Sequence, residues 1–485
     1  MSGDERSIRS ICVAGAGIVG LSAAVSFARA LPRVQVSIVE TPANPAALAD
    51  RMPGSLPSIH RFHSALGMDE LELVRSGVAS HLLGSRVENW SAAGETWYHV
   101  FGEHGLPAGQ VPFQALWQRA QAAARALPFH RYTAAAALAA EGKFVHPSDD
   151  PQSPLGTYLY ALRLDPELYR ERLLAAAGKL PRSSGEIAGA ERRTDGGIAN
   201  VVLKDGRQIE ADLFVDCTGP SASLLSVVDE SFEDWGRWLP CDRVHIAREA
   251  AQEPTSCDRV TATENGWIGR SALPDHTHVV SVCNEEFSGG SAMPDTVAIR
   301  TGRRPQPWVH NVLAIGDGAV AVDPLHSTNL HLAQSGILRA LELLPGRGCH
   351  PLELAEYNRR TEQETTRVRD FLALHYLRSG RRDSPFWSAL AARHPPDSLA
   401  RTLEQFERRG RLPFFEEESF DNESWLAVLF GLGVIPEDVD PAAMSVDLDR
   451  AAAAMDGYAA RIARLPAALP PYRELLAKMK AAPVR

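Results

Sequence analysis

The stretch SIRSICVAGAGIVGLSAAVSFARAL (residues 7–31) decides the fold of this 485-residue chain. It reads as a short apolar strand, a glycine turn and a helix, and VQVSIVE (34–40) reads as the next strand. Glu40 closes that strand twenty residues after Gly20 and is expected to bind ribose hydroxyls. A strand, a GxGxxG turn, a helix and a strand that ends in an acid form a dinucleotide-binding unit. The sequence therefore predicts an α/β, Rossmann-like domain.

The three glycines of this turn have separate expected roles. Gly15 permits the tight turn, Gly17 lets a pyrophosphate approach the backbone, and Gly20 lets the helix and strand pack closely. The first helical turn, which carries Ile18 and Val19, faces the phosphates with free N–H groups and the positive end of the helix dipole. These five residues are the first part of a predicted cofactor site.

Composition narrows the class of protein. The formal net charge is −10, which argues against nucleic acid and anionic membranes as partners, because both are bound through Lys and Arg. The sequence shows neither a secretory signal pattern nor an apolar run of about 18 residues. Its six cysteines include no CxxC pair, and no histidine cluster has zinc spacing. We expect a reduced, cytoplasmic protein without a metal site.

Three later segments predict how the chain continues. NVVLKDGRQIEADLFVDCTG (200–219) predicts a strand, a DG hairpin turn, a second strand and a buried strand. WVHNVLAIGDGA (308–319) predicts another apolar strand that ends at a Gly-Asp pair. Both segments are expected to return to the first sheet. Residues 352–380 have apolar positions at helical spacing, and the chain is expected to be mostly helical from about residue 350.

The order of these motifs resembles flavin-dependent monooxygenases and, more narrowly, the flavin-dependent tryptophan halogenase family. The resemblance extends from about residue 8 to about residue 440. The stretches that carry it are LPSIHRFHSALGMDE (56–70), SRVENW (85–90), WYHVFGEHG (97–105), GRRPQPWVHNVLAIGD (302–317), RDFLALHY (369–376) and FGLGVIPED (430–438). It implies bound FAD, a box-shaped cofactor domain and a pyramid of substrate-binding helices.

The resemblance also implies a mixed α/β chain with an inserted substrate domain and a helical C-terminal part. The expected FAD-binding domain is interleaved and comprises 8–80, 150–230 and 300–346. The expected substrate-covering segments are 81–149 and 231–299, and the helical substrate-binding region is 347–485. In this family a Gly-Asp pair at a strand end holds the ribityl hydroxyls of the flavin. The residues expected to complete the FAD site are therefore Gly316, Asp317, Pro324, Thr328 and Asn329.

The chain departs from the family pattern at the positions that carry halogenation. The family has a lysine eight residues before the tryptophan of its Asn-Trp pair, to carry or steer hypohalous acid, and Leu82 stands there. The family has a glutamate two residues after the proline of the late turn, and His326 stands there. Gly269 replaces the second tryptophan of a family motif in which Trp267 is kept, and Pro53 replaces a glutamate of the early flavin strap.

These departures predict that the halogenating machinery is absent and that the flavin oxidises an aromatic ring directly. A histidine suits a base that removes a proton from the ring, since its ordinary pKa of about 6.5 lies near working pH. His326 is the expected catalytic residue; the alternative is that it only fixes the turn by a hydrogen bond to the backbone. Trp267 and Gly269 are the expected substrate-binding residues, with a plain core role for Trp267 as the alternative. Because Gly269 stands where the family has an indole, the pocket is expected to accept something larger than free tryptophan.

The predicted function is an FAD-dependent monooxygenase that uses O2 to hydroxylate an electron-rich aromatic ring. Resemblance to the flavoprotein monooxygenases of tryptophylquinone biogenesis suggests a tryptophan side chain in a partner polypeptide as the substrate. The alternatives are a halogenase or hydroxylase of a free indole or phenol, and a catalytically silent FAD-binding maturation partner. Because the sequence has no second GxGxxG turn, NAD(P)H is expected to dock transiently or to act through a separate flavin reductase.

Overall fold

The protein is described by a computed structural model for residues 7–150, 153–289 and 295–481. The chain folds into two compact units that alternate along the sequence. Unit 1 comprises Met1–Ala79, Leu164–Asp242 and Val297–Thr366. Unit 2 comprises Ser80–Arg163, Arg243–Thr296 and Arg367–Arg485.

These boundaries differ from the expected domain boundaries mainly toward the C-terminus. The helical region was expected to start at 347 as a part of its own, whereas unit 1 continues to Thr366 and the remainder belongs to unit 2. The reason is that α9 (Pro351–Leu377) is one continuous helix, as the spacing over 352–380 predicts. Its first half is held in unit 1 by a buried ion pair between Arg339 and Glu364 (2.8 Å).

Unit 1 is built on a six-stranded sheet in the order β19–β20–β11–β1–β2–β7. Its strands are β1 (Ser10–Ala14), β2 (Gln35–Glu40), β7 (Arg182–Ser184), β11 (Leu213–Asp216), β19 (Trp308–Val309) and β20 (Val312–Ala314). Ile11 pairs with Leu213, and Phe214 pairs with Val312, both in parallel register. The predicted returns of 200–219 and 308–319 to the first sheet are therefore confirmed.

Unit 1 contains further strands and helices besides this sheet. The hairpin predicted in 200–219 is confirmed, because β9 (Ile198–Leu203) and β10 (Gln208–Glu210) pair in antiparallel register. Other strands are β8 (Ile187–Arg192), β12 (Glu233–Asp234), β17 (Val297–Ala298), β18 (Gly302–Arg303) and β21 (Val320–Ala321). Besides the first half of α9, the helices are α1 (Ile18–Ala30), α2 (Ile59–Leu66), α3 (Glu70–Arg75), α6 (Pro166–Ala177), α7 (Leu225–Val228) and α8 (Thr328–Glu342).

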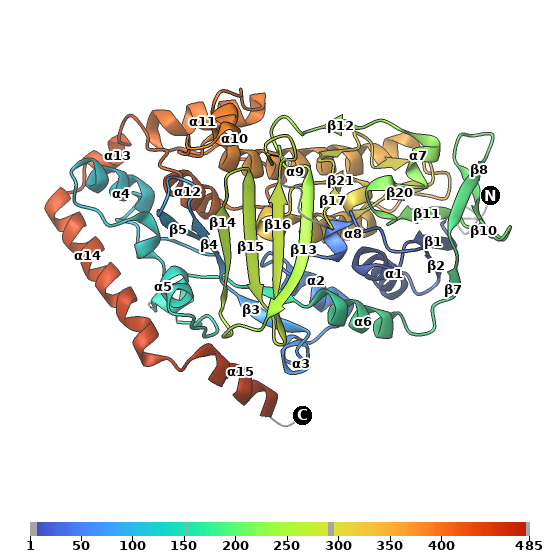
Figure 1. Ribbon diagram of the computed structural model, residues 1–485, viewed down its shortest axis with the longest axis horizontal. Coiled ribbons are helices and arrows are strands. Elements are labelled where there is room, and N and C mark those ends of the chain that lie inside the picture. The colour runs from blue at the N-terminus through green and yellow to red at the C-terminus, as the bar shows by residue number, and fades with distance from the viewer. Residues whose placement is uncertain (1–6, 151–152, 290–294, 482–485) are drawn as a thin grey trace. The chain divides into compact units, whose positions relative to one another are not determined.

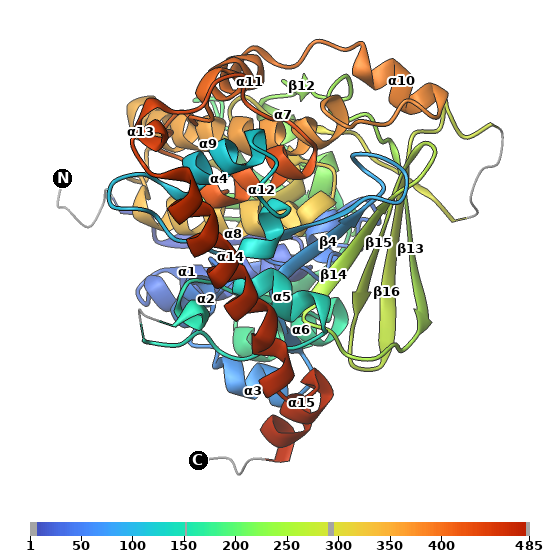
Figure 2. The same ribbon diagram turned by 90° about the vertical axis from the view of Figure 1, so that its left-hand side faces the viewer.

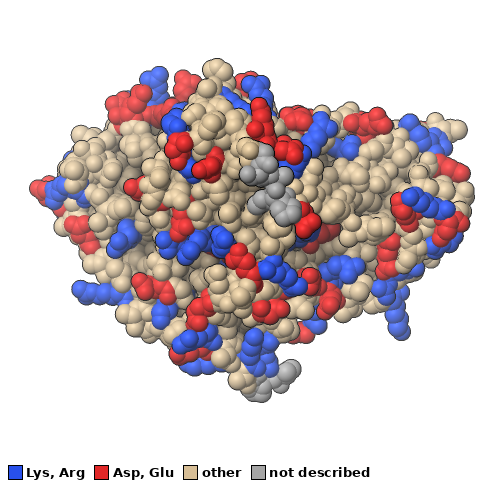
Figure 3. Space-filling view, in the orientation of Figure 1, with Lys and Arg blue, Asp and Glu red and all other residues tan. Residues whose placement is uncertain are grey.

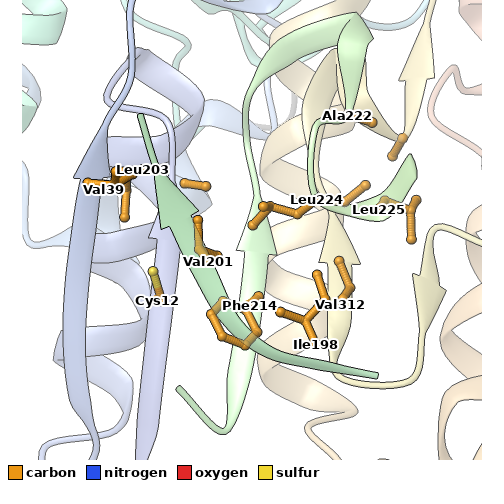
Figure 4. Packing of buried hydrophobic residues seen from close by; sticks show 13 residues of the cluster. Cys12, Val39, Ile198, Val201, Leu203, Phe214, Ala222, Leu224, Leu225 and Val312 are labelled. Carbon is orange, nitrogen blue, oxygen red and sulfur yellow. The ribbon is translucent and has the colours of Figure 1, made fainter. Parts of the chain in front are cut away.

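An apolar core joins β9 to one face of the central sheet (Figure 4). Val201 of β9 lies near Cys12 of β1 and Phe214 of β11, and all three side chains are buried. Cys12 acts as a small apolar residue, as the sequence predicts, and burial raises the pKa of its thiol to about 12. The core fixes the strands whose carboxyl ends carry the candidate site.

The glycine turn between β1 and α1 is closely packed. Gly15 has a φ of 108°, and a Cβ there would overlap the carbonyl oxygen of Cys217, which follows β11. A Cβ at Gly20 would overlap the carbonyl oxygen of Gly15. The Gly15 N–H donates to the carbonyl of Val39 in β2 (2.9 Å). The predicted roles of Gly15 in the tight turn and Gly20 in helix–strand packing follow directly from this geometry.

Unit 2 contains a second, mostly antiparallel sheet with helices packed against it. Within unit 2 the strands run in the order β13–β16–β15–β14–β4–β5, and β13, β16, β15 and β14 lie side by side in Figures 1 and 2. They are β4 (Gly84–Glu88), β5 (Thr96–Val100), β13 (Arg243–Ala250), β14 (Cys257–Ala262), β15 (Gly266–Ala272) and β16 (His276–Cys283). β3 (Ala79–Leu82) and β6 (Ala161–Leu164) each cross a unit boundary.

The helices of unit 2 include two alanine-rich ones, α5 (Ala134–Ala140) and α14 (Leu448–Arg464). Further helices are α4 (Phe113–Ala122), α10 (Pro385–Ala391), α11 (Asp397–Arg409), α12 (Asn422–Gly431), α13 (Pro441–Met444) and α15 (Tyr472–Ala481). The alanines of α5 are small enough to pack closely against Tyr98 and Val100 of β5 and against Tyr472 of α15. The alanines of α5 thus belong to an apolar core of unit 2.

Among the described residues, the structure has no helix with the length and apolar character needed to cross a membrane. On the face shown in Figure 3, Lys and Arg are interspersed with Asp and Glu. The described part of this face therefore presents no continuous basic patch of the kind that binds nucleic acid.

A larger side chain at position 20 must push α1 away from β1. We expect Gly20→Val to lower the free energy of unfolding by about 1–3 kcal/mol, the usual range for overpacking a buried site. Ala30→Val, on the exposed last turn of the same helix, is the matched control and should change it by about 0.5 kcal/mol or less. Urea unfolding measures both variants, and equal stability of the two would contradict the packing role of Gly20.

Candidate functional site

A cavity of about 350 Å³ lies beside the glycine turn of unit 1. Its wall includes the turn after β1, the segment 41–47 after β2 and Cys217–Thr218 after β11. In open, mostly parallel sheets of this kind, dinucleotides bind at the carboxyl ends of the strands that flank the first βα turn. The cavity therefore has the position and the backbone lining that the ADP part of FAD requires.

Three charged side chains that the sequence did not single out also line this cavity: Asp50, Arg51 and Arg170. The Val19 N–H donates to Asp50 Oδ1 (2.8 Å), and Arg170 donates from Nε to the carbonyl of Ala16 (2.9 Å). Asp50 and Arg51 lie two or three residues before Pro53, in the segment that the family resemblance assigns to the early flavin strap. That resemblance was the only sequence feature that could have indicated them. Arg170 lies 154 residues from its partner and gave no local signal.

Glu40 closes β2, as predicted, but is not among the residues that line the cavity. Its Oε2 accepts a hydrogen bond from Ser184 Oγ of β7 (2.6 Å), and Arg182 lies 3.6 Å from Oε1. The neighbouring Thr41 lines the cavity. The contacts of Glu40 in the structure thus hold it to β7, and its predicted binding of a ribose stays a prediction.

Asp317 lies buried in the short turn Gly316–Gly318 that follows β20. The Ala49 N–H donates to its Oδ2 (2.8 Å), and Asn329 Nδ2 donates to its Oδ1 (3.3 Å). Burial raises the pKa of Asp317 to about 7; the Ala49 hydrogen bond opposes this shift and the charge of Asp50 adds to it. Asp317 and Asn329, which the sequence predicts for the same site, are thus in contact with each other, and Asp317 is also bound by Ala49.

The start of α8 carries unsatisfied polar atoms. Thr328 Oγ1 and Asn329 Oδ1 are buried and have no hydrogen-bond partner among the described residues. Buried polar atoms cost free energy unless they are paired, so these two fit a site whose partner is a bound polar group. Together with the glycine turn, they show that the residues of unit 1 fit FAD.

His326 lies in the turn Leu325–Ser327, directly before α8. The side chain is buried, and the backbone of His326 (φ 57°) and Ser327 (φ 55°) is left-handed. Two successive non-glycine residues in this region are unusual, and such strain is concentrated at functional sites. Pro324, two residues before His326, has a φ of −74°.

Trp267 and Gly269 lie on β15 in unit 2 and pack against each other. Trp267 is 2% exposed and donates from Nε1 to the hydroxyl of Tyr376 (3.0 Å). A Cβ at Gly269 would lie 2.9 Å from Val280 Cγ1 and 3.0 Å from Trp267 Cζ3. Neighbouring side chains thus fill the space that a missing indole was expected to leave open. These contacts give both residues a role in packing.

Leu82 ends β3 and is buried, with 4% of its surface exposed. Its side chain ends in methyl groups, so this position supplies neither an amine nor a charge. A buried lysine at the same place would have required a partner for its ammonium group. The structure therefore accommodates an apolar residue where the family carries its lysine.

Comparison with known proteins settles the family. The tryptophan halogenase family profile matches residues 10–447. The chain belongs to the tryptophan halogenase family. It is 26% identical to tryptophan 7-halogenase KtzQ of Kutzneria sp. (strain 744), over 90% of this chain and 91% of that protein.

Two solved structures of flavin-dependent halogenases are similar over their full length. BrvH from Brevundimonas sp. BAL3 has a TM-score of 0.91 and 32% identity. The alignment covers 98% of this chain and 100% of BrvH. Xcc4156 from Xanthomonas campestris has a TM-score of 0.90 and 30% identity. The alignment covers 99% of this chain and 100% of Xcc4156. The predicted fold class, the FAD cofactor and the assignment as an O2-using oxidoreductase are confirmed.

The comparisons support a coarser function than the sequence suggested. The protein is a flavin-dependent enzyme of a family whose substrates are aromatic. The relatives named above are halogenases, and none of them is a monooxygenase of tryptophylquinone biogenesis.

The raised pKa of Asp317 predicts a pH-dependent stability. A carboxyl group whose pKa rises on folding destabilises the folded state as pH increases from its ordinary value of 3.8 to about 7. We expect Asp317→Asn to gain stability relative to the unaltered protein by up to about 1.4 kcal/mol per pH unit in that range, and by a constant amount above it. Urea unfolding of the flavin-free proteins gives this difference, and a difference that does not change with pH would contradict it.

Proposed function

We propose that the protein is an FAD-dependent hydroxylase of a free, electron-rich aromatic compound of the indole or phenol class. The observation that carries this proposal is Leu82, a buried apolar side chain at the position of the family's lysine. Without an amine there, hypohalous acid has no group to carry or steer it. Reduced FAD and O2 together supply an oxidising oxygen atom, and the aromatic ring then becomes the acceptor.

His326 is the proposed general base. An electron-rich ring that gains oxygen must lose a proton, and an unprotonated imidazole nitrogen accepts a proton efficiently near neutral pH. The left-handed backbone at His326 and Ser327 supports this role, because the fold maintains a strained turn at this place. A glutamate at the same position, as in the family pattern, is a weaker base.

Residues of unit 1 are proposed to bind and orient FAD. Gly15, Gly17 and the first turn of α1 meet the pyrophosphate with backbone N–H groups. Asp317, Thr328 and Asn329 offer polar atoms to the ribityl chain and the flavin. The remaining proposed contacts are Ile18, Val19, Gly20, Glu40, Gly316 and Pro324.

The substrate class rests on the relatives. KtzQ is named for tryptophan, an aromatic compound of the indole class, and this supports an indole-type ring as the substrate. A tryptophan side chain in a partner polypeptide is the second candidate; the filled space beside Gly269 removes the argument for an enlarged pocket that favoured it. A screen of free indoles and phenols, run beside a co-expressed tryptophan-containing peptide, separates the two by which product gains oxygen. A silent FAD-binding partner would oxidise neither.

Halogenation should be absent. With reduced FAD, O2 and bromide, free tryptophan and indole are expected to gain no bromine, because Leu82 cannot carry hypohalous acid. Liquid chromatography with mass spectrometry measures the product, and heat-inactivated protein is the control. Bromotryptophan above that control would show that the protein halogenates without the family's lysine.

Removal of the imidazole at position 326 should slow hydroxylation but not flavin binding. We expect His326→Gln to lower the hydroxylation rate by about 100-fold or more, the range for loss of a general base. The pH profile should also lose its limb near neutrality, because glutamine does not titrate. Peroxide release should rise, since the oxidising oxygen finds no activated ring.

His331 on α8 provides the matched control for this variant. Its Nδ1 is hydrogen-bonded to Ser58 Oγ (2.9 Å), and its Nε2 lies 3.5 Å from Glu364. His331→Gln should therefore retain the pH limb. If His326→Gln hydroxylates at the unaltered rate across about one pH unit either side of the ordinary histidine pKa, then His326 only fixes the turn.

A further inference from the structure

The carboxylate of Asp50 occupies the place beside Gly17 that the sequence assigns to a pyrophosphate. A Cβ at Gly17 would overlap the carboxyl group of Asp50. Asp50 Oδ1 accepts a hydrogen bond from the Val19 N–H (2.8 Å), in the first turn of α1. The space left open by the missing side chain of Gly17 is thus filled by an acidic side chain from the strap.

Asp50 acts here as the N-terminal cap of α1. The helix has no acidic residue in its own first turn, and its N-cap residue, Gly17, has no side chain to accept the free N–H groups. An anion at this end is favoured by the N–H donors and by the helix dipole. A carboxylate and a pyrophosphate therefore use the same donors, and both are negatively charged.

Burial and the charged groups around Asp50 determine the pKa of its carboxyl group. Arg170 of α6 lies beside it, Arg51 follows it in the chain, Asp317 approaches from the turn after β20, and Cys217 approaches from the loop after β11. Burial raises the pKa of Asp50 to about 6, and the Val19 hydrogen bond and the charge of Arg170 oppose that shift. Asp50 thus changes its charge close to neutral pH.

We propose that Asp50 holds the pyrophosphate site of the flavin-free protein, and that FAD binding displaces its carboxylate from α1 and adds one proton to it. The proton comes from the solvent, and no covalent bond of FAD changes. Two negative charges of the pyrophosphate beside a third on Asp50 disfavour the ionised carboxyl group, so its neutral form accompanies bound FAD. This inference depends on the FAD site alone and is independent of the hydroxylase proposal.

The consequence is an affinity for FAD that depends on pH. Below about pH 6, Asp50 is already protonated in the free protein, so the Kd for FAD should be constant. Above that pH, binding must take up a proton, and the Kd should rise by up to about tenfold per pH unit. The rise should end at the pKa that Asp50 has in the complex.

FAD binding to the flavin-free protein tests this without any turnover. The Kd is measured by quenching of flavin fluorescence from about pH 5.5 to about pH 8.5, and proton uptake is measured by calorimetry in buffers that differ in ionisation enthalpy. Asp50→Asn keeps the shape of the side chain, and Asp50→Gly removes it. Asp212→Asn is the matched control, because Asp212 also accepts a backbone N–H (from Arg9, 2.8 Å) but at the opposite end of β1.

We expect the unaltered protein and Asp212→Asn to show the rising Kd and an uptake of up to one proton. Asp50→Asn and Asp50→Gly should bind FAD about tenfold or more tightly above pH 7, with little dependence on pH. Asp317→Asn tests whether Asp317, the other carboxyl group with a raised pKa, contributes to the pH dependence of FAD binding. Wild-type affinity and pH dependence in both Asp50 variants would overturn the proposal, and so would a pH dependence that disappears in Asp317→Asn but persists in Asp50→Asn.

Discussion

The close approach of α1 to β1 at the glycine turn is the constraint on which the site depends. A Cβ at Gly15 would overlap the carbonyl oxygen of Cys217, and a Cβ at Gly20 would overlap the carbonyl oxygen of Gly15. Only glycine allows the chain to reverse in this space and direct the N–H groups of the helix toward the strand ends. The direction of α1 then determines where an anion is stabilised, which explains why Asp50 and the cavity for the ADP part of FAD share one place.

The charges of the carboxyl groups beside the glycine turn depend on the electrostatics of their surroundings. Asp50 and Asp317 both have raised pKa values because the fold removes them from water, and the charge of Asp50 adds to the shift of Asp317. The dipole of α1 and the guanidinium of Arg170 offset part of that cost. Bound FAD would bring further negative charge to these carboxyl groups, which is the basis of the proton uptake proposed for Asp50.

The sequence predicts what local patterns determine. The fingerprint over 7–40 predicts β1, α1 and β2, the apolar runs in 200–219 and 308–319 predict two more strands of the same sheet, and helical spacing predicts α9. Contacts between distant segments leave no such pattern. Arg170 reaches Ala16 across 154 residues, and the packing of Val280 and Trp267 around Gly269 depends on strand register. The sequence therefore suggests an enlarged pocket at Gly269, where the fold instead fills the space with these two side chains.

The chemistry of the protein depends on which group receives the oxidising oxygen atom. The family's lysine is replaced by the buried Leu82, and its glutamate by His326 in a strained turn. In the proposed function, the first change removes the group that carries hypohalous acid, and the second supplies the base. The most direct test is a single turnover of the FAD-reduced protein with isotopically labelled O2 and bromide on a panel of indoles and phenols. Mass spectrometry should find the label in a ring hydroxyl group; a brominated ring without the label would contradict the account.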